Sequence, residues 1–230
     1  IASCLVGSEM CIRDRSMAAY FNILLAGVFQ AAVLFLVASG LQLIFGVQRI
    51  VNLACGSIYA LGAYFGIFVT SWALSKGLPV YMFPLVLLGS GIVIGLIGIP
   101  LERLIRTIYN RPESFQLLLT FAVMLMFQDV LRFFWGADPQ QLPNVSMTFG
   151  TMSAFGVSMP TYNVMVIAVA VTLAIGMAYF LGKTKTGKIL RATAENRETS
   201  AAMGINVTRV YVMVFTLGTM LGTIGGALVI

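Results

Sequence analysis

The sequence predicts an all-α membrane protein, a polytopic bundle of about six membrane-spanning helices. Three observations predict this class. Apolar residue types make up 59% of the 230 residues, and the mean hydropathy is +0.95. Charged residues make up 10% of the chain, whereas a soluble domain carries roughly one in four. The charges are also separated by apolar runs, and roughly 20 helical residues suffice to cross about 30 Å of hydrocarbon.

The same composition excludes other classes of protein. A chain so rich in apolar residues is neither a soluble globular enzyme nor a disordered tail. The sequence contains no histidine, which excludes a histidine-based catalytic site or zinc site. Its apolar runs are continuous instead of alternating over about ten residues, which excludes a strand barrel. A pI near 9.5 would indicate nucleic acid only with a soluble basic face and interleaved aromatics, so we expect no nucleic-acid partner.

The uncharged stretches define the spans in order. Residues 16–48 contain no charge over 33 positions, residues 50–75 none over 26, and residues 77–101 none over 25. In the fourth apolar segment Asp129 and Arg132 interrupt the run. The six expected spans are 21–47, 51–74, 79–101, 114–136, 161–182 and 208–230.

The first segment is too long for one straight span, because 33 helical residues would reach about 50 Å. Two interpretations stay open. The helix breaks or bends near Gly40, Gln42 or Gly46, which lipid tolerates only against protein or a water-filled cavity. Alternatively, the segment is a tilted helix with an extension along the membrane interface.

Lysine and arginine predict the orientation. Arg49 and the connections at 102–113 and 183–209 hold ten of the 14 basic residues, and they lie on one side if all six segments cross. The positive-inside rule then puts these connections in the cytoplasm and the amino terminus outside.

Both ends of the chain have unusual sequences. We expect residues 1–16 to be a non-native leader, because they begin without methionine and match no signal peptide. We expect residues 17–230 to form the transmembrane domain, truncated at its carboxyl end, because Ile230 stops inside an apolar run. Cys55 lies in an apolar segment and is expected to be a small packing residue.

Residues 182–188 read GKTKTGK, which fits the first part of the phosphate-binding P-loop motif. A P-loop then needs Ser or Thr, a preceding strand and a following helix. Here Ile189 follows and a membrane helix precedes, so we interpret the stretch as a basic interfacial anchor.

Glycines at four-residue spacing predict close helix packing, because small residues let helices approach in lipid. The residues concerned are Gly91, Gly95, Gly218, Gly222 and Gly226.

Polar residues within the spans are candidates for a translocation path, because such groups are costly in lipid and tend to mark a cavity. The candidates are Asn52, Ser57, Tyr59, Gln128 and Asp129. Asp129 and Arg132 are three residues apart and can pair on a helix face. The alternative is a position at the outer interface, with Arg132 snorkelling.

The connection at 183–209 predicts a short helix outside the bilayer. Asn196 or Thr193 is placed to cap this helix, Gly204 to end it, and Asn206 to cap the next span. Such a helix has an exposed face that nothing in this chain buries, so it is typical of a docking element. A solvated linker is the alternative.

Three stretches resemble permease subunits of branched-chain amino acid ABC importers, the LivH type: 51–64, 127–144 and 182–210. The resemblance covers essentially residues 17–230, in order and at matching spacing. It implies an ABC importer permease fold whose cytoplasmic loop 183–209 is a coupling helix that inserts into an ATPase. The positions it assigns to coupling are Gly187, Arg191, Ala192, Ala194, Glu195, Ala202, Gly204 and Ile205. The positions matching the second-segment motif are Asn52, Ala54, Gly56, Gly62, Ala63 and Tyr64.

The resemblance also implies the partners. We expect a second permease subunit, two cytoplasmic ATPase subunits, a periplasmic or surface substrate-binding protein, and membrane lipid around the spans. The chain itself is expected to be no enzyme and to hold no metal or cofactor, with ATP and Mg²⁺ bound by the partner subunits. The location implied is the inner membrane of a bacterial cell, and the mechanism is alternating access.

Alternatives remain at the level of substrate and class. Where relatives often read N-F-A-H-G, this chain has Leu53 and Cys55. Permeases for urea or short-chain amides are closely similar and stay open. A stand-alone secondary carrier should show midplane carboxylates and inverted repeats; the sequence offers only Asp129 and no convincing repeat.

Overall fold

The computed structural model describes residues 2–77, 82–109, 111–136, 150–154 and 157–229. Within this part of the chain, six helices are long and apolar enough to cross a membrane. They are Tyr20–Gln48, Cys55–Ser75, Phe83–Arg106, Glu113–Trp135, Thr161–Lys183 and Val207–Ala227. The predicted all-α class and the six spans are therefore confirmed, with ends within a few residues of those expected.

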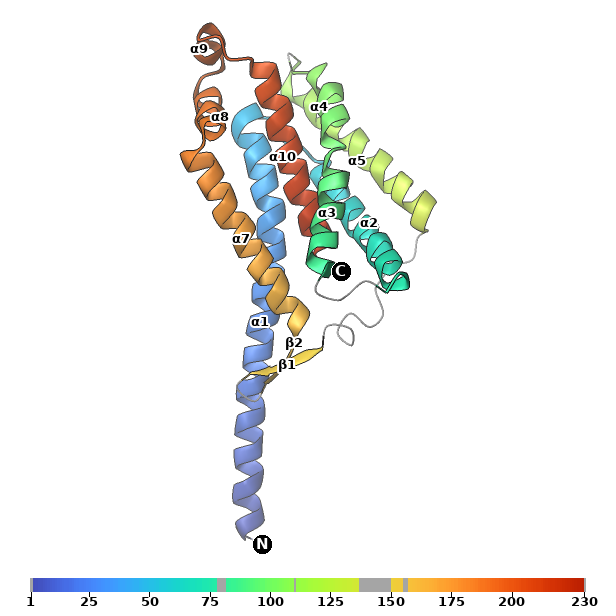
Figure 1. Cartoon of the computed structure of the whole chain (residues 1–230), viewed down its shortest axis with the longest axis vertical. Coiled ribbons are helices and arrows are strands. Elements are labelled where there is room, and N and C mark those ends of the chain that lie inside the picture. The colour runs from blue at the N-terminus through green and yellow to red at the C-terminus, as the bar shows by residue number, and fades with distance from the viewer. Residues whose placement is uncertain (1, 78–81, 110, 137–149, 155–156, 230) are drawn as a thin grey trace.

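Figure 1 shows these helices aligned side by side as a bundle. The labelled helices are α1 (Ala2–Gln48), α2 (Cys55–Ser75), α3 (Phe83–Gly95), α4 (Gly98–Arg106), α5 (Glu113–Trp135), α7 (Thr161–Lys183), α8 (Lys185–Glu195), α9 (Arg197–Ala202) and α10 (Val207–Ala227). Helices α3 and α4 together make up the third span, and α8 and α9 are short helices outside the spans. The sequence did not predict the short antiparallel hairpin before α7. Its strands are β1 (Thr151–Ala154) and β2 (Val157–Pro160), and Thr151 pairs with Pro160.

The first span is one continuous helix, so a break at Gly40, Gln42 or Gly46 is wrong. Gly40 instead allows close approach: a Cβ atom there would lie 3.3 Å from the carbonyl carbon of Gly218 in α10. The helix ends at Gln48, and Arg49 adopts a left-handed backbone conformation with φ 56°. The chain turns there, before α2 begins.

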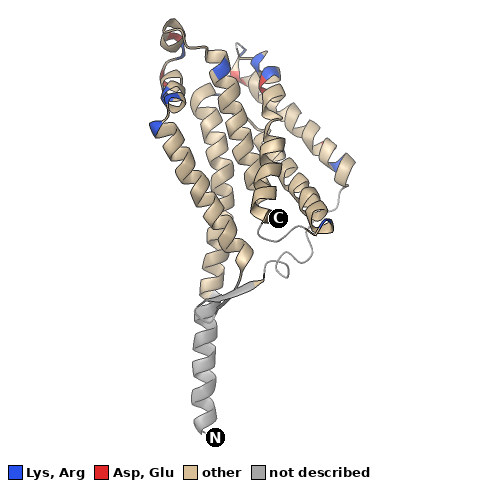
Figure 2. Ribbon diagram, viewed as in Figure 1, with Lys and Arg blue, Asp and Glu red and all other residues tan. Residues whose placement is uncertain are grey.

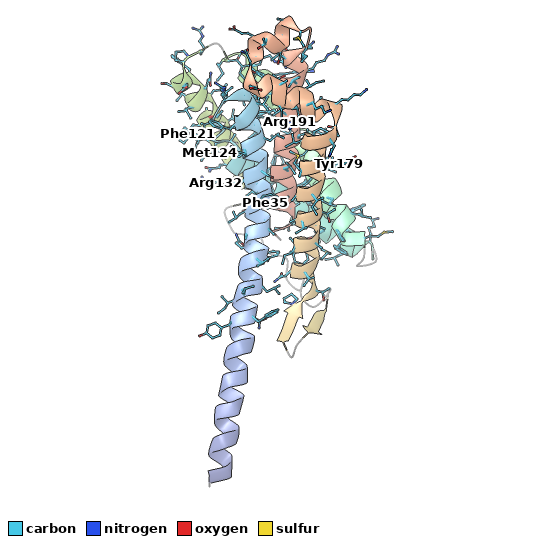
Figure 3. All side chains as sticks on the ribbon, turned by 90° about the vertical axis from the view of Figure 1, so that its left-hand side faces the viewer. Phe35, Phe121, Met124, Arg132, Tyr179 and Arg191 are labelled. Atoms are coloured by element: carbon cyan, nitrogen blue, oxygen red, sulfur yellow. The ribbon has the colours of Figure 1, made fainter. Side chains whose placement is uncertain are left out.

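Helix α10 is the centre of the bundle. It packs against α1, α2, α3 and α4. Within the apolar stretch of α10, about two thirds of the residues are buried (67%), whereas the corresponding share is 11% for α1 and for α7. Residues of α10 belong to all three apolar clusters, with Phe215, Leu221 and Val210 as examples. The outer helices instead expose large side chains such as Phe35 of α1, Phe121 of α5 and Tyr179 of α7 (Figure 3).

Glycine makes this central position possible. A Cβ atom on Gly218 would lie 2.5 Å from Cγ1 of Ile44 in α1. A Cβ atom on Gly226 would meet the carbonyl oxygen of Tyr59 in α2 and lie 3.0 Å from the nitrogen of Ala63. Gly222 differs, because a Cβ atom there would meet nothing within 4 Å. Its place in the four-residue spacing therefore does not correspond to a close contact among the described residues.

The contact of α10 with α3 combines glycine and hydroxyl groups. Added Cβ atoms on Gly91 and Gly95 would lie 2.7 Å from Cα of Ile224 and 2.6 Å from Cα of Met220. The Thr219 hydroxyl donates to the Gly95 carbonyl at 2.9 Å, and the Thr223 hydroxyl donates to the Gly91 carbonyl at 2.6 Å. Small residues and interhelical hydrogen bonds are the two means by which helices associate in lipid.

Basic residues gather at one end of the bundle (Figure 2). This end, called the basic end below, consists of the ends of α1, α4 and α7, the start of α5, helices α8 and α9, and the start of α10. It carries Arg49, Arg103, Arg106, Arg111, Lys183, Lys185, Lys188, Arg191, Arg197 and Arg209. Lys76 and Arg132 lie at the ends of α2 and α5 that point the other way. The charge separation expected from the sequence is thus present in the fold.

Candidate functional site

The connection at 183–209 folds into two short helices at the basic end, α8 and α9, where the sequence predicted one (Figure 1). Asn196 separates them: it ends α8, and its side-chain oxygen accepts hydrogen bonds from the backbone N–H groups of Glu198 and Thr199, both at 3.0 Å. Asn206 caps α10 in the same way by accepting from the Arg209 N–H at 3.2 Å. Asparagine satisfies the free N–H groups at helix starts, so these two caps were predictable from local sequence.

Two local features differ from the expectation. Thr193 caps nothing; it lies within α8, is buried, and its hydroxyl donates to the Ile189 carbonyl at 2.9 Å. The cap of α8 is Thr184, whose hydroxyl oxygen accepts from the Gly187 N–H at 3.0 Å. Gly204, in contrast, follows the end of α9 as expected, with φ +82°, a left-handed conformation that favours glycine.

The eight residues assigned to coupling divide between two faces of this element. Those that face outward are Arg191, Ala192, Glu195, Ala202 and Gly204; those at least half-buried are Gly187, Ala194 and Ile205. Sequence reasoning missed Met203, whose side chain is 83% exposed beside Gly204. An exposed methionine is an adaptable apolar contact for a partner surface. Together, the outward residues form a mixed surface, called the docking face below: Arg191, Ala192, Glu195, Ala202, Met203 and Gly204.

The inward residues attach α8 to the bundle. Leu190 is almost fully buried and packs in one cluster with Leu43 of α1 and Val214 of α10. Gly187 lies against the end of α7, where a Cβ atom would come within 2.7 Å of Cα of Leu181. A displacement of α8 would therefore press directly on α1, α7 and α10, because packed interiors are poorly compressible.

Helix α9 is linked to the bundle through aromatic rings. The Arg197 guanidinium lies over the ring of Tyr211, at 5.5 Å from its centroid. The Tyr211 ring meets the Tyr109 ring edge-on, with centroids 5.4 Å apart. Gln48, at the end of α1, donates from its side-chain nitrogen to the Tyr211 carbonyl at 2.9 Å. These contacts join α1, α9, α10 and the segment after α4.

The linkage ends in a buried carboxylate. Glu102 of α4 is 0% exposed and accepts hydrogen bonds from Nη2 and Nε of Arg106 at 2.5 and 3.2 Å. The Tyr109 hydroxyl donates to the same carboxylate at 3.2 Å. Burial and the Glu102 charge both raise the pKa of Tyr109, so its phenol stays a neutral donor. We call Glu102, Arg106, Tyr109, Tyr211 and Arg197 the α4–α9 link.

Sequence reasoning missed the α4–α9 link. Glu102 and Arg106 are four residues apart at the end of a span, which is the spacing of a helix-face ion pair. That spacing was the available signal for part of the link. Nothing local indicates that Tyr109 and Tyr211 meet, because Tyr109 lies in the turn after α4 and Tyr211 lies in α10, about a hundred residues further along the chain.

The translocation-path candidates in the second segment make contacts with residues close to them in the fold. Asn52 precedes α2 and is 2% exposed; its oxygen accepts from the Ala54 N–H at 3.1 Å, while its side-chain nitrogen has no partner among the described residues. The Ser57 hydroxyl donates to the Ala54 carbonyl at 3.0 Å. Tyr59 is half-buried and packs within an apolar cluster. Cys55 is half-buried against another such cluster, in agreement with a packing role.

The two candidates on α5 lie apart from Asn52. The Thr120 hydroxyl lies 3.5 Å from the carbonyl of Val51, so Asn52 stands beside that turn of α5. Gln128 is eight residues further along, about 12 Å on a helix. Asp129 and Arg132 are both exposed, and no ion pair joins them in the part of the chain that the structure describes. Figure 3 shows Arg132 further from the basic end than Arg191. The fold thus separates the five candidates into two groups.

The second-segment motif contains packing residues. A Cβ atom on Gly62 would lie 2.7 Å from Cα of Thr223 in α10. Ala54 is buried, and the Tyr64 ring lies 5.8 Å from the Trp135 ring at the end of α5. The motif therefore holds α2 between α10 and α5.

Comparison with known proteins identifies the family. Residues 23–230 match the family described as "Branched-chain amino acid transport system / permease component". The high-affinity branched-chain amino acid transport system permease protein LivH of Salmonella typhimurium is 22% identical over 208 residues, which cover 88% of this chain and 68% of that protein. LivH of Escherichia coli matches with the same identity and coverage.

A further relative carries the name of the same kind of permease, BraD, from Pseudomonas aeruginosa. It is 22% identical over 217 residues, covering 91% of this chain and 70% of BraD. No solved structure matches the chain. The family match spans all six helices that could cross a membrane, including α10 at the centre of the bundle. This chain belongs to the family of permease components of branched-chain amino acid transport systems.

Proposed function

We propose that this chain is a permease subunit of an ATP-driven importer for branched-chain amino acids in the inner membrane of a bacterial cell. It would work with a second permease, two cytoplasmic ATPase subunits that bind ATP and Mg²⁺, and a substrate-binding protein outside. The observation that carries the proposal is the docking face. A transport subunit without chemistry of its own needs a surface through which an energy source moves it, and α8 and α9 offer one outside the spans.

The mechanism we propose is alternating access driven through that surface. Closure of the ATPase pair on ATP moves the docking face. Leu190 and Gly187 pass the movement to α1, α7 and α10, and the α4–α9 link passes it to α4. Because α10 packs against α1, α2, α3 and α4, its displacement repacks the bundle and exposes the path on the other side. Specificity would rest mostly in the substrate-binding protein.

Reconstitution tests this function directly. The chain, co-expressed with a second permease, ATPase subunits and a binding protein of a branched-chain amino acid transport system, should co-purify with the ATPase and take up labelled leucine only with ATP. Excess isoleucine and valine should compete, whereas urea and acetamide should not. Competition by urea or acetamide alone would assign the permease to the related amide importers. Uptake without the ATPase would contradict the proposal.

The orientation can be measured with single cysteines in a background without native cysteine. Lys188→Cys, in α8, should react with an impermeant thiol reagent only after the membrane is opened, because the basic end faces the cytoplasm. Lys76→Cys, at the opposite end of α2, should react in intact cells. The reverse order of labelling would contradict the orientation.

Gly204→Val should lower both the stimulated ATP hydrolysis and the transport that depends on it. A β-branched residue in the left-handed region costs on the order of 1–2 kcal/mol locally, and a Cβ atom at Gly204 would meet no atom of the described residues within 4 Å. The spans should therefore remain inserted, while the end of α9 changes direction at the docking face. We expect a several-fold loss of the ATPase activity stimulated by loaded binding protein, with a parallel loss of uptake.

Three control variants accompany this measurement. Gly204→Asn should retain activity, since asparagine tolerates left-handed backbone. Glu195→Lys should reproduce the loss by reversing charge on the docking face, more strongly at low salt. Lys76→Glu, at the other end of the bundle, should have nearly no effect. Normal coupling in both Gly204→Val and Glu195→Lys would make the loop a mere linker.

A further inference from the structure

A groove with a basic rim lies between α4 and α10 at the basic end. Its volume is about 480 Å³, and its rim includes Arg103, Arg106 and Arg209. Arg106 is paired with the buried Glu102, whereas Arg103 and Arg209 are exposed and form no ion pair with any residue that the structure describes. We call this the α4–α10 groove. It presents two uncompensated positive charges in addition to the paired one.

Below the arginines the groove is apolar and runs along the helices. Ile99 lies one turn before Arg103 in α4, and Val212 and Met220 follow Arg209 in α10. From Arg209 to Met220 is 11 residues, about 16 Å of helix. These helices are spans, so the apolar part lies at the depth of hydrocarbon and the arginines at the depth of headgroups.

The charge around the groove has one sign. Helix α10 contains no acidic residue, and the one acidic residue of α4 is Glu102. That carboxylate is fully buried and already bound by Arg106 and Tyr109, so it does not oppose an anion at Arg103 and Arg209. A phosphate group would therefore find two unpaired guanidinium groups, which recognise phosphate through forked hydrogen bonds.

We propose that the α4–α10 groove binds one anionic phospholipid. The phosphate lies between Arg103 and Arg209, and an acyl chain follows Val212 toward Met220. Basic pockets between spanning helices at the cytoplasmic side are suited to acidic headgroups, and the apolar length beneath the charges distinguishes a lipid from a free anion. Glu102 adds a connection: it holds Arg106 at the rim of the groove and belongs to the α4–α9 link, so the lipid would sit beside the proposed coupling path.

Lipid retention tests the proposal without any measurement of transport or ATP hydrolysis, so its outcome is independent of the proposed function. The chain is purified into nanodiscs of phosphatidylcholine with increasing phosphatidylglycerol, and lipid retained after transfer to detergent is counted by native mass spectrometry. The wild-type chain should retain one phosphatidylglycerol molecule in preference to phosphatidylcholine. Each arginine near an acidic headgroup contributes about 1 kcal/mol, which is about five-fold in affinity. Arg103→Gln with Arg209→Gln should therefore weaken retention by about 25-fold.

Matched variants distinguish an effect of the groove from an effect of the total positive charge at the basic end. Lys185→Gln with Lys188→Gln removes two exposed cations from α8 at the same end, outside the groove, and should change retention less than two-fold. Met213→Trp keeps every charge but fills the groove with a larger side chain, and it should also release the lipid. An excess of inorganic phosphate should not displace it.

Four results would overturn the proposal. Equal retention of phosphatidylcholine would show that the headgroup charge is not recognised. An equal loss of lipid retention in the α8 control would show that retention depends on the general positive charge of the surface and not on the groove. Displacement by phosphate would make the groove an anion site, and loss of the lipid from wild-type chain assembled with its partner subunits would show that a protein helix occupies it.

Discussion

Gly226→Ala is expected to destabilise the protein, although alanine is normally favoured over glycine inside a helix by roughly 0.5–1 kcal/mol. The added methyl group would meet the carbonyl oxygen of Tyr59 and lie 3.0 Å from the nitrogen of Ala63. Both are backbone atoms of α2, which cannot rotate away as a side chain can. Overpacking of this kind costs about 1–3 kcal/mol, so α2 and α10 should separate locally and the apparent Tm in detergent should fall.

Gly222→Ala is the matched control, one turn earlier on the same helix. A Cβ atom there meets nothing within 4 Å, so the intrinsic preference for alanine should raise stability by several tenths of a kcal/mol. The two changes therefore have opposite expected signs for the same chemical substitution. Gly62→Ala tests the same helix pair from α2, since its Cβ atom would lie 2.7 Å from Cα of Thr223. If Gly226→Ala and Gly222→Ala shift the Tm equally, the close approach of α2 and α10 is wrong.

Glu102→Ala is expected to have the second large effect. It removes the acceptor of two hydrogen bonds from Arg106 and one from Tyr109, in a site with no solvent access. Leaving buried donors without a partner costs about 1–3 kcal/mol each. Arg106 is partly exposed and can turn to water, so we expect a total of about 2–3 kcal/mol. The measurement is equilibrium unfolding of the purified chain in mixed micelles.

Three further variants make this prediction specific. Glu113→Ala removes an exposed carboxylate at the start of α5 and should change stability by less than about 0.5 kcal/mol. Replacing Glu102 and Arg106 together by leucine should recover part of the loss, because it removes the guanidinium together with its acceptor and leaves only the Tyr109 hydroxyl without its partner. A double variant no better than Glu102→Ala would mean that an unpaired Arg106 is not the cause of the loss. Tyr109→Phe should cost about 1 kcal/mol, through its single hydrogen bond.

The spans could be predicted because lipid imposes a local rule. A charge inside hydrocarbon is expensive wherever it lies in the fold, so apolar stretches with few or no charges place six helices. The caps Asn196 and Asn206 were predictable for a similar reason, since each acts on N–H groups two or three residues away. The segment 51–64 could likewise be matched to relatives, although Leu53 and Cys55 depart from the usual motif.

The arrangement of polar and small residues within the spans could not be predicted from the sequence, because it depends on distant partners. Asn52 and Gln128 are both polar and both in apolar segments, but α2 and α5 bring them to different levels of the bundle. Gly40 could break a helix or permit close contact, and the position of α10 beside it decides for contact. The burial of Glu102 could not be predicted from the sequence, because it results from Tyr109 and the helices around it.

The sequence by itself determined the class of protein, the six spans, the accumulation of basic residues at one end and the family. All of these follow from composition and short-range order, and a membrane makes such signals strong by removing water from the backbone. The tertiary structure alone decided that α10 is central, that Gly226 is a contact and Gly222 is not, and that Arg103 and Arg209 border one groove. The physical reason is that glycine and arginine act through what lies opposite them, and only the packing of helices far apart in the sequence supplies that neighbour.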